Sequence, residues 1–140
     1  MKNGGILNTG GNIELISIED VGDYDYGIYL DPGSSNTLNL SNTTFDLYGR
    51  SVGIYSGWDR IDFGTGNTIN LTGNVGIGIL YEVTNKSPVT SVSSIVENSG
   101  IINVQRGMGI YVSDSANIGS KTVENNGQIN ISGGGTGIVI

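Results

Sequence analysis

The sequence contains neither cysteine nor histidine, and it has only 2 prolines. Without cysteine the chain can form no disulfide, no thiolate metal site and no cysteine nucleophile. This absence does not assign the chain to the cytosol, because a repeat protein can gain its stability from neighbouring repeats instead of disulfides. We therefore expect a fold that holds together without cross-links.

Positive charge is also scarce. Only 6 residues are Lys or Arg, against 13 Asp and Glu, and the formal net charge is −7. The chain has no basic stripe with which to neutralise phosphates, so we expect no nucleic-acid partner. An anionic membrane surface is disfavoured for the same reason.

Long apolar runs are missing as well. The first residues, MKNGG, lack the apolar core of a signal peptide. No run approaches the roughly 18 apolar residues of a membrane-spanning helix, so we expect no membrane insertion of this segment. We interpret Met1 as a start added to a fragment.

What the sequence does contain is an internal repeat. The segment Val96–Val112 (VENSGIINVQRGMGIYV) returns with few changes at Val123–Val139 (VENNGQINISGGGTGIV). Each copy joins an apolar start, a polar turn, an I-N-aliphatic triplet and a later Gly-Ile pair. A period of about 20 to 50 residues is the sequence signature of solenoids and related repeat folds.

The same frame covers most of the chain in five degenerate copies. The earlier copies begin with Leu7–Leu15, Leu40–Leu47 and Phe63–Leu71. We predict one domain over residues 1–140, which we interpret as a fragment of a longer repeat array. The structural-repeat residues are Gly27, Ile28, Gly53, Ile54, Gly78, Ile79, Ile102, Val104, Gly109, Ile110, Ile129, Ile131, Gly137 and Ile138.

The local pattern predicts short strands and essentially no α-helix. Triplets such as Ile69-Asn70-Leu71 and Ile102-Asn103-Val104 alternate apolar and polar residues, which turns one face of a strand inward. Three short strands and three corners in about 27 residues suit one coil of a parallel β-helix, whose coils stack about 4.8 Å apart. We therefore predict an all-β fold, a parallel β-helix or β-solenoid of about five coils.

Glycine at the corners is expected to supply a left-handed backbone conformation. Gly11, Gly100 and Gly127 share one position of the frame, with Asn67 as the tolerated substitute. The copy that begins at Leu40 is one residue shorter and has Thr43 at this position. Its corner should therefore differ in turn type.

Variable segments separate the third strand of one coil from the first strand of the next. Insertions in a solenoid project from one face and commonly carry binding, so we expect specific recognition there. One further insertion, Ile16–Tyr26, lies within the first coil. The variable segments between coils are Asp31–Thr37, Ser56–Arg60, Glu82–Ser94 and Ser113–Lys121.

The first candidate site is an acidic span that contains Asp20, Asp23 and Asp25 and no Lys or Arg. Ca²⁺ takes six to eight oxygen ligands, and such a span could supply some of them. The spacing matches neither an EF-hand nor the calcium-binding nonapeptide repeat. We assign no metal site here; a calcium site and a solvated acidic loop stay open as alternatives.

The second candidate is a column of polar residues. Glu14, Asp46, Asn70, Asn103 and Asn130 share one position of the frame and should stack on the outer face of the second strand. Two stacked carboxylates would lie near the roughly 5–5.5 Å that retaining glycosidases use. Any two acids in such a column have about this separation, so a ladder of solvated or amide-bonded side chains is the alternative. We predict no catalytic residue and no cofactor.

The third candidate is a corner that contains Trp58, Asp59 and Arg60, with Asp62 beside it. A protruding aromatic side chain next to polar groups can stack on a sugar ring or dock on a protein. Trp58 can equally fold over its own loop. Trp58, Asp59 and Arg60 are our candidate ligand contacts.

Tyrosines recur beside the Gly-Ile pairs. Tyr29, Tyr55 and Tyr111 follow a pair at one position of the frame, and Tyr81 lies near it. Aromatic residues on neighbouring strands stack readily, so we expect an exterior aromatic ladder; a recognition strip is the alternative.

The motifs N-x-G-x-I-N-[VI] and G-x-G-I-Y-V, repeated without cysteine, resemble the passenger domains of Gram-negative autotransporters of the type V secretion class, large surface adhesins in particular. This resemblance implies a single-stranded, right-handed parallel β-helix that is exported and displayed on the bacterial cell surface. It also implies adhesive or self-associating faces, and it carries no catalytic residues over to this chain.

An extracellular scaffold or adhesive segment is therefore the expected function. Segments around Trp58 and Glu82–Ser94 would contact a host or bacterial surface protein or glycan, and uncapped ends would allow self-association. The alternative is a fragment of a β-helical polysaccharide lyase, hydrolase or phage tailspike, which requires a groove that holds Asp46, Asp59 and Asp62 together. An ice-binding face needs a regular T-x-T array, which the sequence lacks.

Overall fold

A computed structural model describes residues 6–16, 24–31, 36–57, 59–73, 76–82, 94–113 and 122–140. Within these ranges the chain forms strands and turns and no helix, so none of them holds a helix that could cross a membrane. The strands are β1 (Ile6–Ile16), β2 (Asp25–Leu30), β3 (Thr37–Tyr48), β4 (Ser51–Ser56), β5 (Ile61–Phe63), β6 (Thr68–Thr72), β7 (Ile77–Tyr81), β8 (Ser94–Asn98), β9 (Ile101–Val104), β10 (Met108–Val112), β11 (Thr122–Asn125), β12 (Gln128–Ile131) and β13 (Thr136–Val139).

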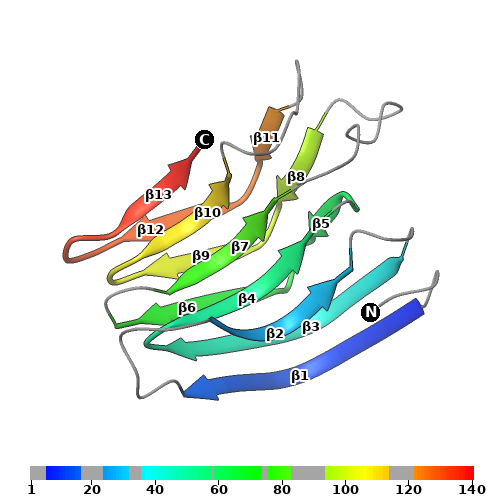
Figure 1. Ribbon diagram of the computed structural model, residues 1–140, viewed down its shortest axis with the longest axis horizontal. Helices are drawn as coiled ribbons and strands as arrows, with labels where there is room; N and C mark the ends of the chain where they lie inside the picture. The colour runs from blue at the N-terminus through cyan, green and yellow to red at the C-terminus, as the bar shows by residue number, and fades with distance from the viewer. Residues whose placement is uncertain are drawn as a thin grey trace.

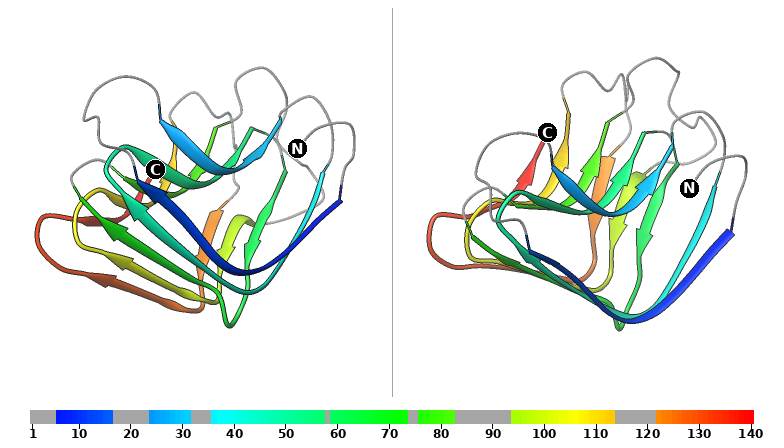
Figure 2. Two further views of the ribbon diagram at one scale, coloured as in Figure 1. Left: turned by 90° about the horizontal axis from the view of Figure 1, so that it is seen from below. Right: turned by 60° about the horizontal axis from the view of Figure 1, so that its bottom comes forward.

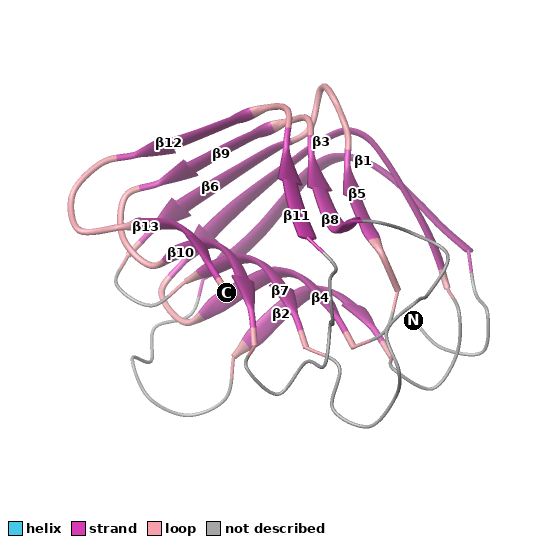
Figure 3. Cartoon of the chain, turned by 90° about the horizontal axis from the view of Figure 1, so that it is seen from above, coloured by secondary structure: helices cyan, strands magenta, loops and turns pink. Residues whose placement is uncertain are grey.

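The strands stack as a solenoid with three walls (Figures 1 and 3). Sheet A has the order β1-β3-β6-β9-β12, sheet B the order β2-β4-β7-β10-β13, and sheet C the order β5-β8-β11. Neighbouring strands in all three sheets are parallel. Five strands in sheets A and B correspond to about four turns of the chain, which confirms the predicted all-β solenoid.

The repeat frame read from the sequence is also the register of the strands. In sheet A, Ile102 pairs with Ile129 and Val104 with Ile131. In sheet B the isoleucines of the five Gly-Ile pairs form one column: Ile28, Ile54, Ile79, Ile110 and Ile138. The structural-repeat residues therefore lie at equivalent places in successive coils.

The glycines of these pairs allow sheets A and B to approach each other. A Cβ atom on Gly53 would lie 2.6 Å from the carbonyl oxygen of Gly78 and 3.1 Å from Cδ1 of Leu47. The strand also changes face here, because Val52 packs in an outer apolar cluster while Ile54 packs in the core. The strands of sheet B therefore bend at these glycines, and side chains of sheet A pack against them. No larger residue fits at these positions.

The core lies between the three sheets and is apolar. Burial of each such side chain contributes about 1.5–3 kcal/mol, so the middle coils hold most of the stability. Burial falls toward the last coil, where Ile131 is 52% exposed and Ile138 is 39% exposed. Side chains with no exposed area include Phe45, Ile54, Phe63, Ile69, Ile79, Ile102 and Ile110.

The predicted alignment of the first strands is wrong in two copies. Ile61, and not Phe63, pairs with Val96. Leu38, and not Leu40, pairs with Leu7. The reason is the same in both copies, since residues two apart on a strand share a face and either can take the inward place.

The corner of the second copy is longer than predicted. Thr9 pairs with Leu40 and Gly11 with Thr43, so β3 has one more residue than β1 at this point. The expectation of a shorter copy is wrong, whereas the expected irregular corner is present as a bulge. Both strands are long and bend along their length (Figure 2).

The predicted reason for the corner glycines holds for Gly11 alone, which has φ +85°. Gly100, Gly127 and Asn67 are not among the residues with positive φ. A Cβ atom on Gly100 would lie 2.5 Å from the carbonyl oxygen of Asn67, and one on Gly127 would meet the carbonyl oxygen of Gly100. Close contact between stacked corners, and not backbone conformation, therefore requires glycine at these two positions.

Candidate functional site

The outer face of sheet A carries a ladder of hydrogen-bonded side chains. Asp46, Asn70, Asn103 and Asn130 are register partners on β3, β6, β9 and β12. Nδ2 of Asn70 donates to Oδ1 of Asp46 at 2.9 Å. Nδ2 of Asn103 donates to Oδ1 of Asn70 at 2.8 Å, and Nδ2 of Asn130 to Oδ1 of Asn103 at 2.9 Å. The amide-bonded interpretation of the predicted column is confirmed for these four residues.

Glu14 extends the same column toward β1. It is the register partner of Asp46, and its side chain is exposed. The two carboxylates that suggested a glycosidase therefore do stack as expected. Asp46 also accepts the hydrogen bond from Asn70, so it is the last acceptor of the amide ladder.

A second polar column runs beside the ladder. Tyr48 and Thr72 are register partners, and Gln105 and Ser132 continue the column on the next two coils. The backbone N–H of Gln105 donates to the carbonyl oxygen of Leu71 at 3.1 Å, which fixes this position. Each member lies two residues after a ladder residue and so shares its face of the sheet. This column could not be found from the sequence because its members share no residue type.

The two columns border an open groove of about 460 Å³ that follows the stacked coils. Leu71, Val104 and Ile131 lie between the columns. The lining contains one carboxylate, that of Asp46, and neither Lys nor Arg. The groove therefore offers neutral hydrogen-bonding groups in a regular row.

Asp59 has a structural contact at the corner between β4 and β5. It is 7% exposed, and its carboxylate accepts hydrogen bonds from the backbone N–H of Asn36 at 3.0 Å and from Nδ2 of Asn36 at 3.2 Å. Burial raises the pKa of Asp59 above its ordinary value of 3.8, although the bonds from Asn36 oppose this shift. Asp59 thus holds the start of β3 against the next coil, while its neighbour Trp58 lies outside the described residues.

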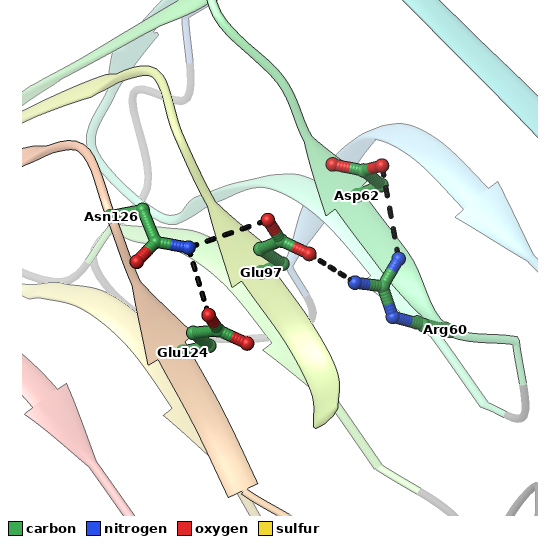
Figure 4. Close-up of polar contacts among 5 residues, drawn as sticks. All are labelled: Arg60, Asp62, Glu97, Glu124 and Asn126. Atoms are coloured by element: carbon green, nitrogen blue, oxygen red, sulfur yellow. Dashed lines mark hydrogen bonds and ion pairs between the residues drawn. The ribbon is translucent and has the colours of Figure 1, made fainter. Parts of the chain in front are cut away.

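Arg60 belongs to a charged cluster on sheet C (Figure 4). Its guanidinium pairs with the carboxylate of Glu97 and lies 3.8 Å from Oδ2 of Asp62. Nδ2 of Asn126 donates to Oε1 of Glu124 at 2.9 Å and to Oε1 of Glu97 at 3.4 Å. The three acids are register partners on β5, β8 and β11. Glu97 and Glu124 were not among the predicted site residues, although they occupy equal places in the duplicated segment.

The polysaccharide-cleaving alternative required Asp46, Asp59 and Asp62 in one groove, and the structure does not bring them together. Asp46 lies in the sheet A ladder, Asp59 is buried at a corner, and Asp62 is exposed on sheet C beside Arg60. A general acid and a second carboxylate must flank one bond, so these three residues cannot form that pair.

The predicted calcium candidates are only partly described. Asp20 and Asp23 lie outside the described residues. Asp25 is the exposed first residue of β2, and its backbone N–H donates to the carbonyl oxygen of Arg50 at 3.1 Å. Within the part of the chain that the structure describes, no three His, Cys, Asp or Glu residues are grouped so that they could hold a metal ion.

The tyrosines form an outer cluster on sheet B. Tyr29 and Tyr55 stack with ring centroids 4.4 Å apart and an interplanar angle of 11°. Tyr26 meets both rings edge-on, at 5.2 and 5.5 Å. Tyr81 differs, since it points into the core and its burial raises its pKa to about 12.

Two features thus stand out as chemically capable. The sheet A groove can exchange hydrogen bonds with an uncharged ligand, and in the sheet C cluster Arg60 pairs with Glu97 and Asp62. Comparisons with models of protein families, with curated proteins and with solved structures found no match to this chain.

Proposed function

We propose that this chain is a rigid extracellular scaffold that displays binding segments, as part of an adhesive protein on a bacterial cell surface. One observation carries the proposal. Four connections that differ widely in length follow strands of sheet B, and the last residues of those strands are register partners: Leu30, Ser56, Tyr81 and Val112. Most of the variation in length therefore lies at one corner of the solenoid; the connection of residues 17–24 between β1 and β2 is the exception.

The other corners vary much less. The connections from sheet C to sheet A are residues 64–67, 99–100 and 126–127, and after β3, β6, β9 and β12 the connections from sheet A to sheet B are residues 49–50, 73–76, 105–107 and 132–135, all short. The segments that follow sheet B are residues 31–36, 57–60, 82–93 and 113–121, which differ widely in length. A constant coil with one variable corner is typical of repeat proteins that bind through that corner.

The expected partners are a host or bacterial surface protein or a glycan, or another copy of the chain through its ends. The resemblance to autotransporter passenger domains supports export and display on the cell surface. We do not propose polysaccharide cleavage, because the acids that it requires lie on different walls of the solenoid.

Adhesion of beads that carry the chain, applied to host cells and to a glycan array, tests this proposal. Residues 83–93 and 114–120 are replaced by Gly-Ser segments of equal length, together with Trp58→Ala. We expect adhesion to be lost while circular dichroism and the unfolding midpoint stay the same. Unchanged adhesion after all three replacements would show that the variable corner is not the binding surface. Thr65→Ala, at an exposed position of another corner, is the matched control.

A further inference from the structure

We propose that the groove on sheet A is a binding site for a linear, uncharged polysaccharide that lies along the solenoid axis. This goes beyond the proposed function, which places recognition in the connections that follow sheet B. The groove is formed by two polar columns on consecutive coils, from Asp46 and Tyr48 on β3 to Asn130 and Ser132 at β12.

The ladder has hydrogen-bonding positions that a ligand can use. A carboxamide has two N–H donors and one oxygen with two acceptor positions. Asn70 and Asn103 each donate one hydrogen bond and accept one within the ladder. These two central rungs therefore each retain one donor and one acceptor position for a ligand. A sugar hydroxyl can donate and accept at once, so it matches such a rung.

The side chains of the ladder are held in place before a ligand binds. Each central amide is held by its neighbours on both sides, at 2.8 and 2.9 Å for Asn103. Side chains that are ordered before binding lose little further entropy when a ligand arrives. The ladder is therefore a preorganised surface, unlike a set of free polar side chains.

The spacing of the rungs matches the spacing of sugar rings. Coils of a parallel solenoid repeat about every 4.8 Å, and so do the rungs. A pyranose ring in an extended chain advances by a similar distance, so successive rings can meet successive rungs. An extended peptide advances about 3.3 Å per residue and presents side chains to one face at twice that interval, which does not match.

The charge of the groove favours an uncharged ligand. The lining has the single carboxylate of Asp46 and no cation, and the whole chain has a formal net charge of −7. Acidic polysaccharides and nucleic acids would be repelled. Asp46 and its register partner Glu14 lie only at the β3 end of the groove, which is too little charge to hold a polycation along its length, but a carboxylate there can accept a strong hydrogen bond from a hydroxyl. An uncharged chain of sugars fits this balance.

Tyr48 completes the groove at the end formed by β3. Its side chain is 41% exposed and belongs to the second polar column beside Asp46. An exposed aromatic ring offers an apolar face for a sugar ring at low entropic cost, with a hydroxyl at its tip. Tyr48 is therefore the residue whose removal should weaken binding most.

The test is titration of the whole chain with three uncharged probes, cellohexaose, chitohexaose and mannohexaose, by calorimetry and by NMR of the side-chain amides. We expect at least one probe to bind and to shift the amide signals of Asn70, Asn103 and Asn130. Tyr48→Ala should weaken binding about tenfold, which corresponds to the loss of one aromatic contact, and Gln105→Ala should weaken it by a smaller factor. The NMR shifts are measured on the unsubstituted chain, so they do not depend on how the variants fold.

Gln128→Ala is the matched control, because Gln128 is an exposed residue of the same sheet outside the groove. Its affinity should equal that of the unsubstituted chain. The proposal is overturned if none of the three hexasaccharides binds, or if dextran sulfate or hexalysine shifts the ladder amides more than they do. The Gly-Ser variant separates this site from the proposed function: it should still bind the hexasaccharide, whatever happens to adhesion.

Discussion

Sheets A and B have the same number of strands in the same parallel order, yet their outer faces differ in chemistry. The outer face of sheet A carries carboxamides and hydroxyls that line a groove. The outer face of sheet B carries Val52, Tyr55, Ile77 and Leu80 on its middle strands, none more than 7% exposed, while at its β2 edge Tyr26 and Tyr29 are exposed, at 39% and 40%. The same repeated coil thus produces a polar, solvent-exposed outer face on sheet A and a packed apolar outer face on the middle strands of sheet B.

The cause of this difference is local. Around the ladder, strands of sheet A alternate apolar and polar residues, as in Ile69-Asn70-Leu71. Strands of sheet B run through four apolar or glycine positions, such as Val52-Gly53-Ile54-Tyr55, and bend at the glycine. The bend turns Ile54 inward while Val52 and Tyr55 face outward. A strict period of two leaves a polar face exposed, and a bent apolar run creates a second apolar layer.

The largest expected effect tests whether the outer face of sheet B is a true core. Ile77 is 2% exposed, so Ile77→Ala should lower the free energy of unfolding by about 2–5 kcal/mol, as for other buried aliphatic truncations. Thr72→Ala on the outer face of sheet A should change it by less than about 0.5 kcal/mol. Urea unfolding measures both. Equal effects at the two positions would remove the distinction between the faces.

The next effect concerns the glycine column that produces the bend. A Cβ atom on Gly78 would lie 2.5 Å from the carbonyl oxygen of Gly109 and 3.4 Å from Cγ2 of Ile69. Gly78→Ala should therefore cost about 1–3 kcal/mol of stability, the usual cost of overpacking.

Gly134→Ala is the matched control for this substitution, because a Cβ atom there meets nothing within 4 Å. It should leave the unfolding midpoint in urea nearly unchanged. A tolerated Gly78→Ala would mean that the coils can move apart, and the account of the bend would then fail.

The sequence alone was sufficient for the fold because one signal repeats. Each Gly-Ile pair is weak evidence by itself, but five pairs at similar intervals fix the stack and hence the register of sheet B. It was insufficient for the corners. Phe63 and Ile61 are both apolar and share a face, so only the length of the corner before β6 decides which one pairs with Val96.

Glycine was ambiguous for a related reason. A positive φ and a close approach of two backbones both call for a residue without Cβ, and the letter G does not tell them apart. Gly11 is the first case, and Gly100 and Gly127 are the second. The ladder could be predicted because asparagine repeats in it. The column of Tyr48, Thr72, Gln105 and Ser132 could not, since register is all that these residues share.

A smaller effect distinguishes the middle of the ladder from its end. Asn103 takes part in two ladder hydrogen bonds and Asn130 in one. At about 0.5–1 kcal/mol for each of these partly exposed bonds, Asn103→Ala should destabilise the chain by about 1–2 kcal/mol and Asn130→Ala by roughly half as much. Urea unfolding gives the free energies, and the amide NMR signal of Asn70 should move only in the Asn103 variant. Identical losses of stability in the two variants would indicate that the hydrogen bonds between rungs do not contribute to the free energy of unfolding.

The smallest effect concerns Asp59, a buried polar group at the corner that follows sheet B. Its pKa is raised by burial above the ordinary 3.8, so the folded chain holds the proton to a higher pH than the unfolded chain does. Stability should therefore decrease as pH rises from 3.8 through the raised value, because the unfolded state then binds fewer protons. Asp59→Asn removes this titration.

We expect the stability of Asp59→Asn, relative to the unsubstituted chain, to increase as pH rises from below 3.8 toward neutrality. Urea unfolding at the two ends of this range measures the difference. Asp59→Ala is the control: it removes the acceptor for both hydrogen bonds from Asn36 and should destabilise the chain at either pH. If the relative stability of Asp59→Asn decreased with rising pH, the bonds from Asn36 would outweigh desolvation. Asp59 would then stabilise the folded chain as an ionised carboxylate. In that case its hydrogen bonds would matter more than its burial, as for the polar side chains on the outer face of sheet A.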